Sequence, residues 1–161
     1  WFIIREAKRL GREDIVKKAA NAILVTSRLA WDEQYGGMMY YLDRDGGMPR
    51  GRVPGDERAQ SDNIIRDWDS KLWWPHTETI YAHLLCYSIL NDSDHLEQYE
   101  RYHRYTFDTF PNPNPDVKEW IQIRDRQGRP GNPNVGDRLP VKDPYHAMRN
   151  LYLLIELMRQ M

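Results

Sequence analysis

The sequence KLWWPHTE, residues 71–78, combines side chains that suit the recognition of a sugar. Because proline is tolerated in the first helical turn, we expect a helix to begin at this proline, with Trp74 and Glu78 on one face. An indole can stack on the C–H face of a sugar ring while a carboxylate accepts hydrogen bonds from its hydroxyls. The alternative is that Trp73 and Trp74 are core aromatics and Glu78 is solvated.

A second candidate lies near the end of the chain, where His146 follows Asp143 and Pro144 at the start of a predicted helix. The partial positive charge at a helix start disfavours a protonated imidazole, so this histidine could accept a proton as a general base. Arg149 lies three residues on, on the same helical face, where it could hold an oxyanion or a sugar hydroxyl. The alternative is that His146 only packs and bonds to a backbone carbonyl.

Other chemistries lack their sequence signatures. His83, His95 and His103 lie in amphipathic segments without an acid or thiol at metal-binding spacing, and Cys86 is the one cysteine of the chain. We therefore predict no metal site. The sequence has no phosphate-binding glycine loop, dinucleotide fingerprint or Gly-x-Ser-x-Gly elbow, so acid–base chemistry is the main enzymatic option.

Composition indicates one globular unit. The 161 residues suffice for one core, and 23 basic against 24 acidic residues create no net field for nucleic acid or a membrane surface. No apolar run approaches the ~20 residues of a membrane span. The single cysteine favours a reducing compartment. The chain opens inside a helical pattern at Trp1, so we expect it to be part of a longer protein.

The elements that must position these residues are mainly helices. Apolar residues recur at three- and four-residue steps, and the stripe expected on the fourth helix is Leu96, Tyr99, His103, Thr106 and Phe110. Ser93 or Asp94 is expected to cap that helix. The predicted helices cover residues 1–10, 12–30, 75–91, 93–110 and 144–161.

Short hairpins are expected between the helices. Residues 35–42 are predicted to form a strand entering a turn at Asp43–Gly46, and residues 49–62 a polar loop. A second strand is expected at residues 120–123, before a similar turn at Asp125–Gly128. Because the two turn sequences resemble each other, we predict two repeated units, each a hairpin with helices.

These motifs resemble those of the N-acylglucosamine 2-epimerases, or renin-binding proteins, and their relatives the cellobiose 2-epimerases and mannose isomerases. The resemblance covers nearly the whole chain and rests most specifically on the Trp-Trp-Pro-His block and the late His-x-x-Arg. The matching residues are Glu33–Gly37, Tyr41–Gly46, Lys71–Glu78, Glu119–Trp120, Arg124–Gly128, Lys142 and His146–Arg149.

The resemblance implies a mainly α fold, an (α/α)6 barrel with two concentric rings of helices and the site at the end of the inner ring. Residues 1–161 would form the C-terminal part of that single domain. Members open the sugar ring and remove the C2 proton to give an enediolate. Epimerases then return the proton to the opposite face of C2, and isomerases return it to C1.

The resemblance also assigns residues. It makes His146 one of two acid–base histidines, the other belonging to a Gly-His-x-x-Glu motif upstream of a segment like Trp1–Ile4. Val141 stands where relatives usually carry a tryptophan, and His76 suits the N-acylglucosamine branch better than the cellobiose branch. The expected substrate-binding residues are Trp74, Glu78, Arg149, His76 and Trp73.

The sequence therefore predicts a cytoplasmic sugar 2-epimerase acting on N-acetylglucosamine and N-acetylmannosamine or a similar aldose, with no required cofactor. The resemblance also allows ATP as an allosteric activator and a homodimer. The alternatives are an aldose–ketose isomerase and a non-catalytic sugar-binding or protein-interaction module. A glycoside hydrolase would need two opposed carboxylates, and only Glu78 is well placed.

Overall fold

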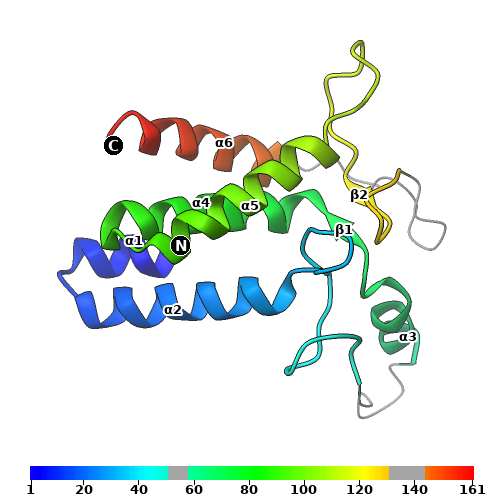
Figure 1. Cartoon of the computed structure of the whole chain (residues 1–161), viewed down its shortest axis with the longest axis horizontal. Helices are drawn as coiled ribbons and strands as arrows, with labels where there is room; N and C mark the ends of the chain where they lie inside the picture. Colours follow the sequence, from blue (N-terminus) through cyan, green and yellow to red (C-terminus); the bar gives the residue numbers. More distant parts are fainter. Residues whose placement is uncertain (51–57, 131–143) are drawn as a thin grey trace.

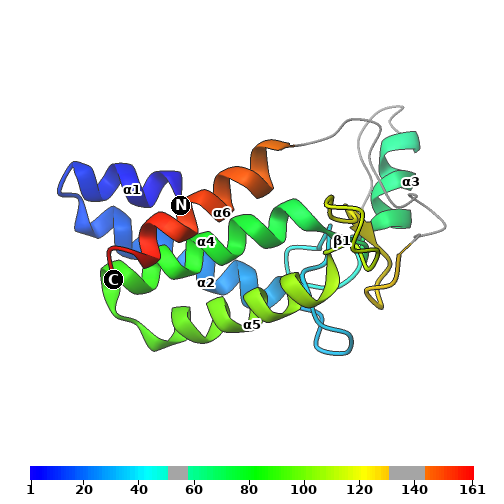
Figure 2. The same cartoon turned by 90° about the horizontal axis from the view of Figure 1, so that it is seen from above.

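The computed structural model describes residues 1–50, 58–130 and 144–161. The helices lie side by side in both views, except for one of ten residues, which gathers with two short strands at one end of the molecule (Figures 1 and 2). The elements are α1 (Phe2–Arg9), α2 (Glu13–Ala30), α3 (Arg58–Asp67), β1 (Lys71–Leu72), α4 (Trp73–Leu90), α5 (Ser93–Thr109), β2 (Ile123–Arg124) and α6 (Pro144–Met158).

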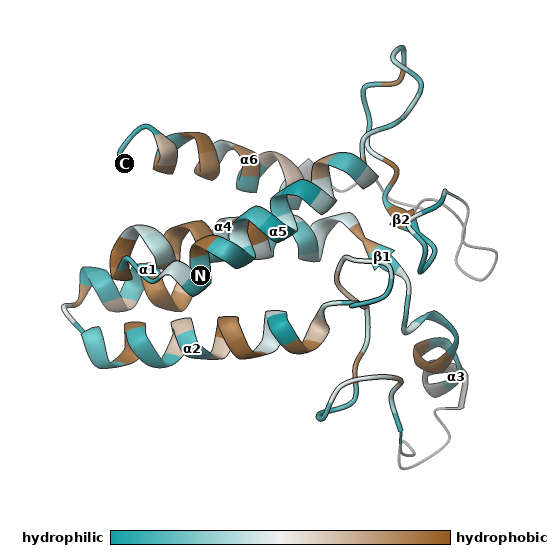
Figure 3. Cartoon of the chain, in the orientation of Figure 1, coloured by the Kyte–Doolittle hydropathy of each residue, from teal (hydrophilic) through white to brown (hydrophobic). Residues whose placement is uncertain are grey.

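Helix α4 is the centre of the packing, in contact with α2, α5 and α6. Its sequence contains no basic residue and one acidic residue, Glu78, and ten of its residues are buried. A helix that is apolar on every side is stable only when it is surrounded. Figure 3 shows the contrast with α5, which is mostly hydrophilic and covers one side of the core.

The helix ends follow local signals in the sequence. Gly11, two residues after the end of α1, has a φ of +67°, and Asn91, directly after α4, has a φ of +52°. Both residue types enter the left-handed region at low cost, which stops a helix. The predicted helices are confirmed, and their ends differ from the observed ones by at most three residues, the largest difference being at the end of α6.

The predicted stripe of α5 is confirmed at Thr106 and Phe110, which are fully buried, whereas its other members are only partly buried: Leu96, Tyr99 and His103. The other buried side chains of α5 are polar or amphipathic, and those of His95 and Tyr102 are hydrogen-bonded, so apolar periodicity does not mark them. The cap is also different, because the Asp92 carboxylate accepts from the Asp94 backbone N–H at 3.0 Å. The residues that α5 buries are His95, Gln98, Tyr102 and Thr106.

The predicted strand at residues 35–42 is also wrong. Gly36 and Gly37 have φ values of +77° and +75°, and the segment forms turns with an isolated bridge between Trp31 and Met38. The predicted loop at residues 49–62 is wrong at its end, where α3 begins at Arg58. Residues 51–57, Val141, Lys142 and the expected cap Asp143 lie outside the described residues.

The two strands do not form separate hairpins. Strand β2 pairs antiparallel with β1, with Lys71 opposite Arg124, and so joins the entry of α4 to the segment after α5. The two repeated turns nevertheless have the same form. In each, the glycine N–H donates to the aspartate carbonyl, at 2.9 Å in Asp43–Gly46 and 3.0 Å in Asp125–Gly128. The prediction of two hairpin units is therefore corrected to two matching turns beside one shared strand pair.

In the part of the chain that the structure describes, no helix combines the length and the apolar character that crossing a membrane requires. The N-terminal ends of α4 and α6 and the C-terminal end of α2 all point to the end of the molecule that carries β1 and β2 (Figure 1). Side chains at the starts of α4 and α6 therefore lie at one end of the helical layer.

Candidate active site

Glu78 is the meeting point of the predicted site. Its Oε1 lies 2.7 Å from Nδ1 of His146 and also accepts a hydrogen bond from the Arg149 guanidinium. Its Oε2 accepts from the indole N–H of Trp1 at 2.5 Å. Residues far apart in the sequence, from the N-cap of α1 and from α6, thus converge on one carboxylate of α4.

Helical spacing explains this convergence. Trp74 and Glu78 lie one turn apart on α4, while His146 and Arg149 lie one turn apart on α6, so the two faces meet where these helices pack. The ring centroids of Trp74 and His146 are 5.1 Å apart. The expectation that an indole, an acid and the late histidine lie together agrees with this geometry.

The hydrogen bonds around Glu78 keep it ionised. Burial raises the pKa of Glu78, but the hydrogen bonds from His146, Trp1 and Asn150, together with the Arg149 charge, outweigh burial, so the pKa is lowered overall. An ionised carboxylate only accepts hydrogen bonds, so Nδ1 of His146 carries the proton in this contact. In the neutral ring, Nε2 is then the basic nitrogen.

Aromatic rings surround the Arg149 guanidinium. Its carbon lies 4.1 Å from the ring centroid of Tyr145, 5.1 Å from Trp1 and 5.5 Å from Phe2. Cation–π contacts of this kind hold a guanidinium in place beside its carboxylate partner. Trp1 therefore supports the site twice, through its indole N–H and through its ring face, although sequence reasoning assigned it no role.

A groove of about 340 Å³ lies beside Glu78, between α2 and α4. It is mainly apolar, with hydroxyls from Thr26, Ser27 and Thr79. Neither His146 nor Trp74 lines it, so the groove borders the candidate site on the α2 side of Glu78 rather than containing the histidine.

The structure does not bring His76 and Trp73 to this cluster. His76 is fully buried, accepts from the Met38 backbone N–H at 2.8 Å through Nε2, and donates to the Leu72 carbonyl at 2.6 Å through Nδ1. Trp73 is buried beside Phe110 in a second, smaller core. Because both side chains are committed to the interior, we withdraw them from the predicted substrate contacts.

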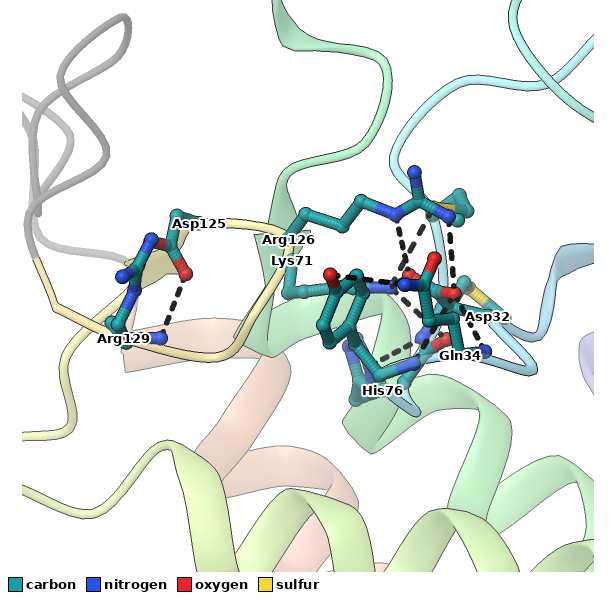
Figure 4. Close-up of polar contacts among 11 residues, drawn as sticks. Asp32, Gln34, Lys71, His76, Asp125, Arg126 and Arg129 are labelled. Atoms are coloured by element: carbon teal, nitrogen blue, oxygen red, sulfur yellow. Dashed lines mark hydrogen bonds and ion pairs between the residues drawn. The ribbon is translucent and has the colours of Figure 1, made fainter.

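A second charged cluster, the Asp32 cluster, was missed by sequence reasoning. Asp32 accepts from Lys71 Nζ at 3.0 Å and from Arg126 Nε at 2.9 Å, and the Lys71 side chain is 0% exposed. Figure 4 shows Asp32 between these two cations, with the Asp125–Arg129 pair in the neighbouring turn. The cluster ties the end of α2 to β1 and to the turn after β2. The partners come from distant segments, so no local pattern predicts the cluster.

Comparison with known proteins gives consistent results. The sequence model of the N-acylglucosamine 2-epimerase family matches residues 1–149. The N-acylglucosamine 2-epimerase of Mus musculus is 30% identical over 155 residues, 94% of this chain and 32% of that protein. The Bos taurus enzyme is 28% identical over 165 residues, 100% of this chain and 34% of that protein. The chain thus spans about a third of the length of these relatives.

Two solved structures share the fold. A D-mannose isomerase superposes with a TM-score of 0.73 at 19% identity, over 99% of this chain and 34% of that one. A sugar epimerase from a ruminal bacterium superposes with a TM-score of 0.62 at 18% identity, over 100% of this chain and 36% of that one. These likenesses confirm the predicted fold class, a portion of a larger (α/α)6 barrel. Together with the family match, they show that the chain belongs to the N-acylglucosamine 2-epimerase family.

Proposed function

We propose that this chain supplies part of the acid–base machinery of a sugar 2-epimerase acting on N-acetylglucosamine and N-acetylmannosamine or a similar aldose. The observation that carries the proposal is the contact between Nδ1 of His146 and the ionised Glu78 carboxylate, beside the indole of Trp74. The names of the relatives, N-acylglucosamine 2-epimerase, support the choice of sugar.

The proposed chemistry begins with the open-chain sugar, in which the C2 hydrogen is acidified by the C1 carbonyl. Nε2 of His146 takes this hydrogen as a proton, and the C–H electron pair forms the C1–C2 double bond while negative charge moves to O1. The histidine becomes an imidazolium beside Glu78, a carboxylate that stabilises it. Return of a proton to the opposite face of C2 gives the epimer.

A base on one face of C2 cannot deliver a proton to the other face. The resemblance places the second histidine upstream of a segment like Trp1–Ile4, so we expect the 161-residue chain alone to be inactive. Trp74 lies within ring-contact distance of His146, where it can stack on the apolar face of the bound sugar. We further propose that the protein needs no cofactor, that ATP activates it, that it forms a homodimer and that it is cytoplasmic. These parts of the proposal are taken from the resemblance and the composition alone.

The test follows hydrogen exchange at C2. The full-length protein is incubated in deuterated water with each candidate sugar, and the C2 proton signal is followed by NMR. Loss of that signal with formation of the epimer is expected. No exchange with any aldose would reject the proposal.

An aldose–ketose isomerase is the second candidate, favoured by the likeness to a D-mannose isomerase. The same experiment separates the two, because an isomerase delivers deuterium to C1 of a ketose. The third candidate, a non-catalytic sugar-binding or protein-interaction module, would bind a sugar without exchange.

A further inference from the structure

We propose that Ser27, His83 and His95 form an acid-sensitive latch that fastens α2 and α5 onto α4, and that this latch is closed only while the facing nitrogens of the two rings carry one hydrogen between them. The three side chains come from three different helices, and all three residues are buried. Helices α2 and α5 both pack against α4 (Figure 2). The inference is independent of the proposed sugar chemistry, and its test needs no substrate.

The hydrogen bonds of the latch run in one direction. Nδ1 of His83 lies 2.8 Å from Nδ1 of His95, and Nε2 of His83 lies 2.9 Å from Oγ of Ser27. The Ser27 hydroxyl has a single hydrogen, which it donates to the Leu24 carbonyl at 3.0 Å. Oγ therefore accepts from Nε2–H of His83. Nδ1 of the same neutral ring is then an acceptor, and Nδ1–H of His95 donates to it.

This arrangement limits how many protons the pair can hold. A proton added to Nε2 of His95 leaves the contact between the two Nδ1 atoms intact. A proton added to Nδ1 of His83 would set two N–H groups against each other across 2.8 Å, so the contact would have to open. The closed latch therefore accepts one extra proton at most.

Burial keeps both rings neutral near pH 7. It lowers the pKa of His83 to about 3 and also lowers the pKa of His95. The carboxylates of Asp92 and Asp94 oppose this effect at His95, so the first proton is expected there, while the positive charge of Arg28 disfavours a proton on either ring. Among the described residues, the charged and titratable groups around the two rings are Arg28 on α2, Cys86 on α4, and Asp92, Asp94 and Tyr102 at or on α5.

A second tie between α2 and α5 does not depend on pH. The Tyr102 hydroxyl donates to the Ser27 carbonyl at 2.8 Å, and a tyrosine hydroxyl does not titrate in mild acid. Ser27 also lines the groove beside Glu78. Opening the latch therefore loosens the α2 wall of that groove, while Tyr102 provides a neutral contact for comparison.

The first experiment determines the two tautomers by NMR of the full-length protein with ¹⁵N-labelled histidine at pH 7.5. His83→Gln and His95→Asn assign the two signals. The Nε2–H form is expected for His83 and the Nδ1–H form for His95. The opposite pair of tautomers would overturn the proposal, and this result does not require either variant to be as stable as the wild type.

The second experiment measures protection of backbone amides in α2 and α5 against hydrogen exchange at pH 7.5 and 5.5, corrected for the intrinsic effect of pH. Opening lets each ring bind a proton with an ordinary pKa of ~6.5, so acid favours the open state. We expect wild-type protection to fall about 100-fold between these pH values, about tenfold for each ring.

Variants separate the titrating tie from the neutral one. In His95→Asn, the side-chain N–H can still donate to His83 but does not titrate, so protection should fall only about tenfold. His83→Gln also removes one titrating ring and should show the same smaller fall. Tyr102→Phe should lower protection at both pH values and keep the 100-fold fall of the wild type. A fall as large as that of the wild type in His95→Asn and His83→Gln would overturn the proposal.

Discussion

Asp32 and Glu78 are two carboxylates held in similar ways with different consequences. Each accepts from two cationic or titratable side chains, Lys71 and Arg126 for Asp32, and His146 and Arg149 for Glu78. Asp32 is 2% exposed, whereas Glu78 is 20% exposed and its partner His146 is 31% exposed. A buried carboxylate between two cationic side chains holds distant segments together, but a partly exposed carboxylate bound to an imidazole can direct a proton.

The pKa values of Asp32 and Lys71 agree with a structural role for the Asp32 cluster. Burial raises the pKa of Asp32, but hydrogen bonds from Arg126 and Lys71 outweigh it and bring the pKa to about 2. Burial lowers the pKa of Lys71 to about 8 despite the opposing effect of Asp32. Both groups are thus charged at neutral pH and depend on each other for that charge.

The largest expected effect comes from breaking the Asp32 cluster. Asp32→Asn leaves Lys71 and Arg126 without their carboxylate, so we expect a loss of about 3–5 kcal/mol in the free energy of unfolding, measured in urea. Glu78→Gln, at the partly exposed site, should cost about 1 kcal/mol. Equal losses in the two variants would remove the distinction between the clusters.

The next effect concerns the backbone that lines the Asp32 cluster. The Gly37 carbonyl accepts from Lys71 at 3.4 Å, and a Cβ on Gly37 would lie 2.4 Å from the Tyr105 ring. We expect Gly37→Ala to destabilise the protein by about 1–3 kcal/mol. The control is Gly47→Ala, which has a similar φ of +77° but no atom within 4 Å of the added Cβ. Gly47→Ala should lower the free energy of unfolding only through backbone strain. A loss as large as that of Gly37→Ala would refute the steric explanation.

As the pH falls, protonation of buried histidines should lower the free energy of unfolding before Asp32 becomes protonated. Burial lowers the pKa of His76 and His83 to about 3, and Nδ1 of His83 lies 2.8 Å from Nδ1 of the buried His95. The unfolded chain binds protons below pH ~6.5 while the folded chain does not, so stability is complete above that pH and falls as pH drops toward 3.

The expected slope is about 1.4 kcal/mol per pH unit for each such histidine below pH ~6. The Asp32 contribution disappears only below pH ~3.8. Urea unfolding at pH 7, 6 and 5 measures the slope, and His83→Gln should make it shallower. A free energy of unfolding that stays constant from pH 7 to 5 would show that these histidines titrate normally.

The smallest effect is expected at the aromatic residue that we propose stacks on the sugar. Trp74 is only partly buried and contacts the His146 ring. Trp74→Phe keeps an aromatic face, so KM for the sugar should rise less than about 10-fold, equivalent to less than about 1.4 kcal/mol. Stability should change little, as urea unfolding of the same variant would verify. A large loss of stability would instead place Trp74 with Trp73 in the core.

Sequence reasoning predicted the features that depend on local spacing. Glycine and asparagine mark the ends of α1 and α4, and one-turn spacing pairs Trp74 with Glu78 and His146 with Arg149. It failed where buried polar groups are satisfied by distant partners. Examples are the Asp32 cluster, the His83–His95 pair and the strand pairing of β1 with β2.

The contacts of Glu78 were beyond sequence reasoning for the same reason. The spacing placed its carboxylate on the correct face but did not indicate that Trp1 and Arg149 would occupy it. A carboxylate beside an indole looks the same in sequence whether it binds a sugar or another side chain. Only the three-dimensional arrangement separates these roles.

The central claim, that His146 transfers the C2 proton, is tested most directly by His146→Asn in the full-length protein. Deuterium exchange at C2 is measured by NMR, and sugar binding is measured by calorimetry on the same preparation. We expect exchange to fall by about 100-fold or more while the affinity for the sugar changes little. Exchange at the wild-type rate in His146→Asn would contradict the account.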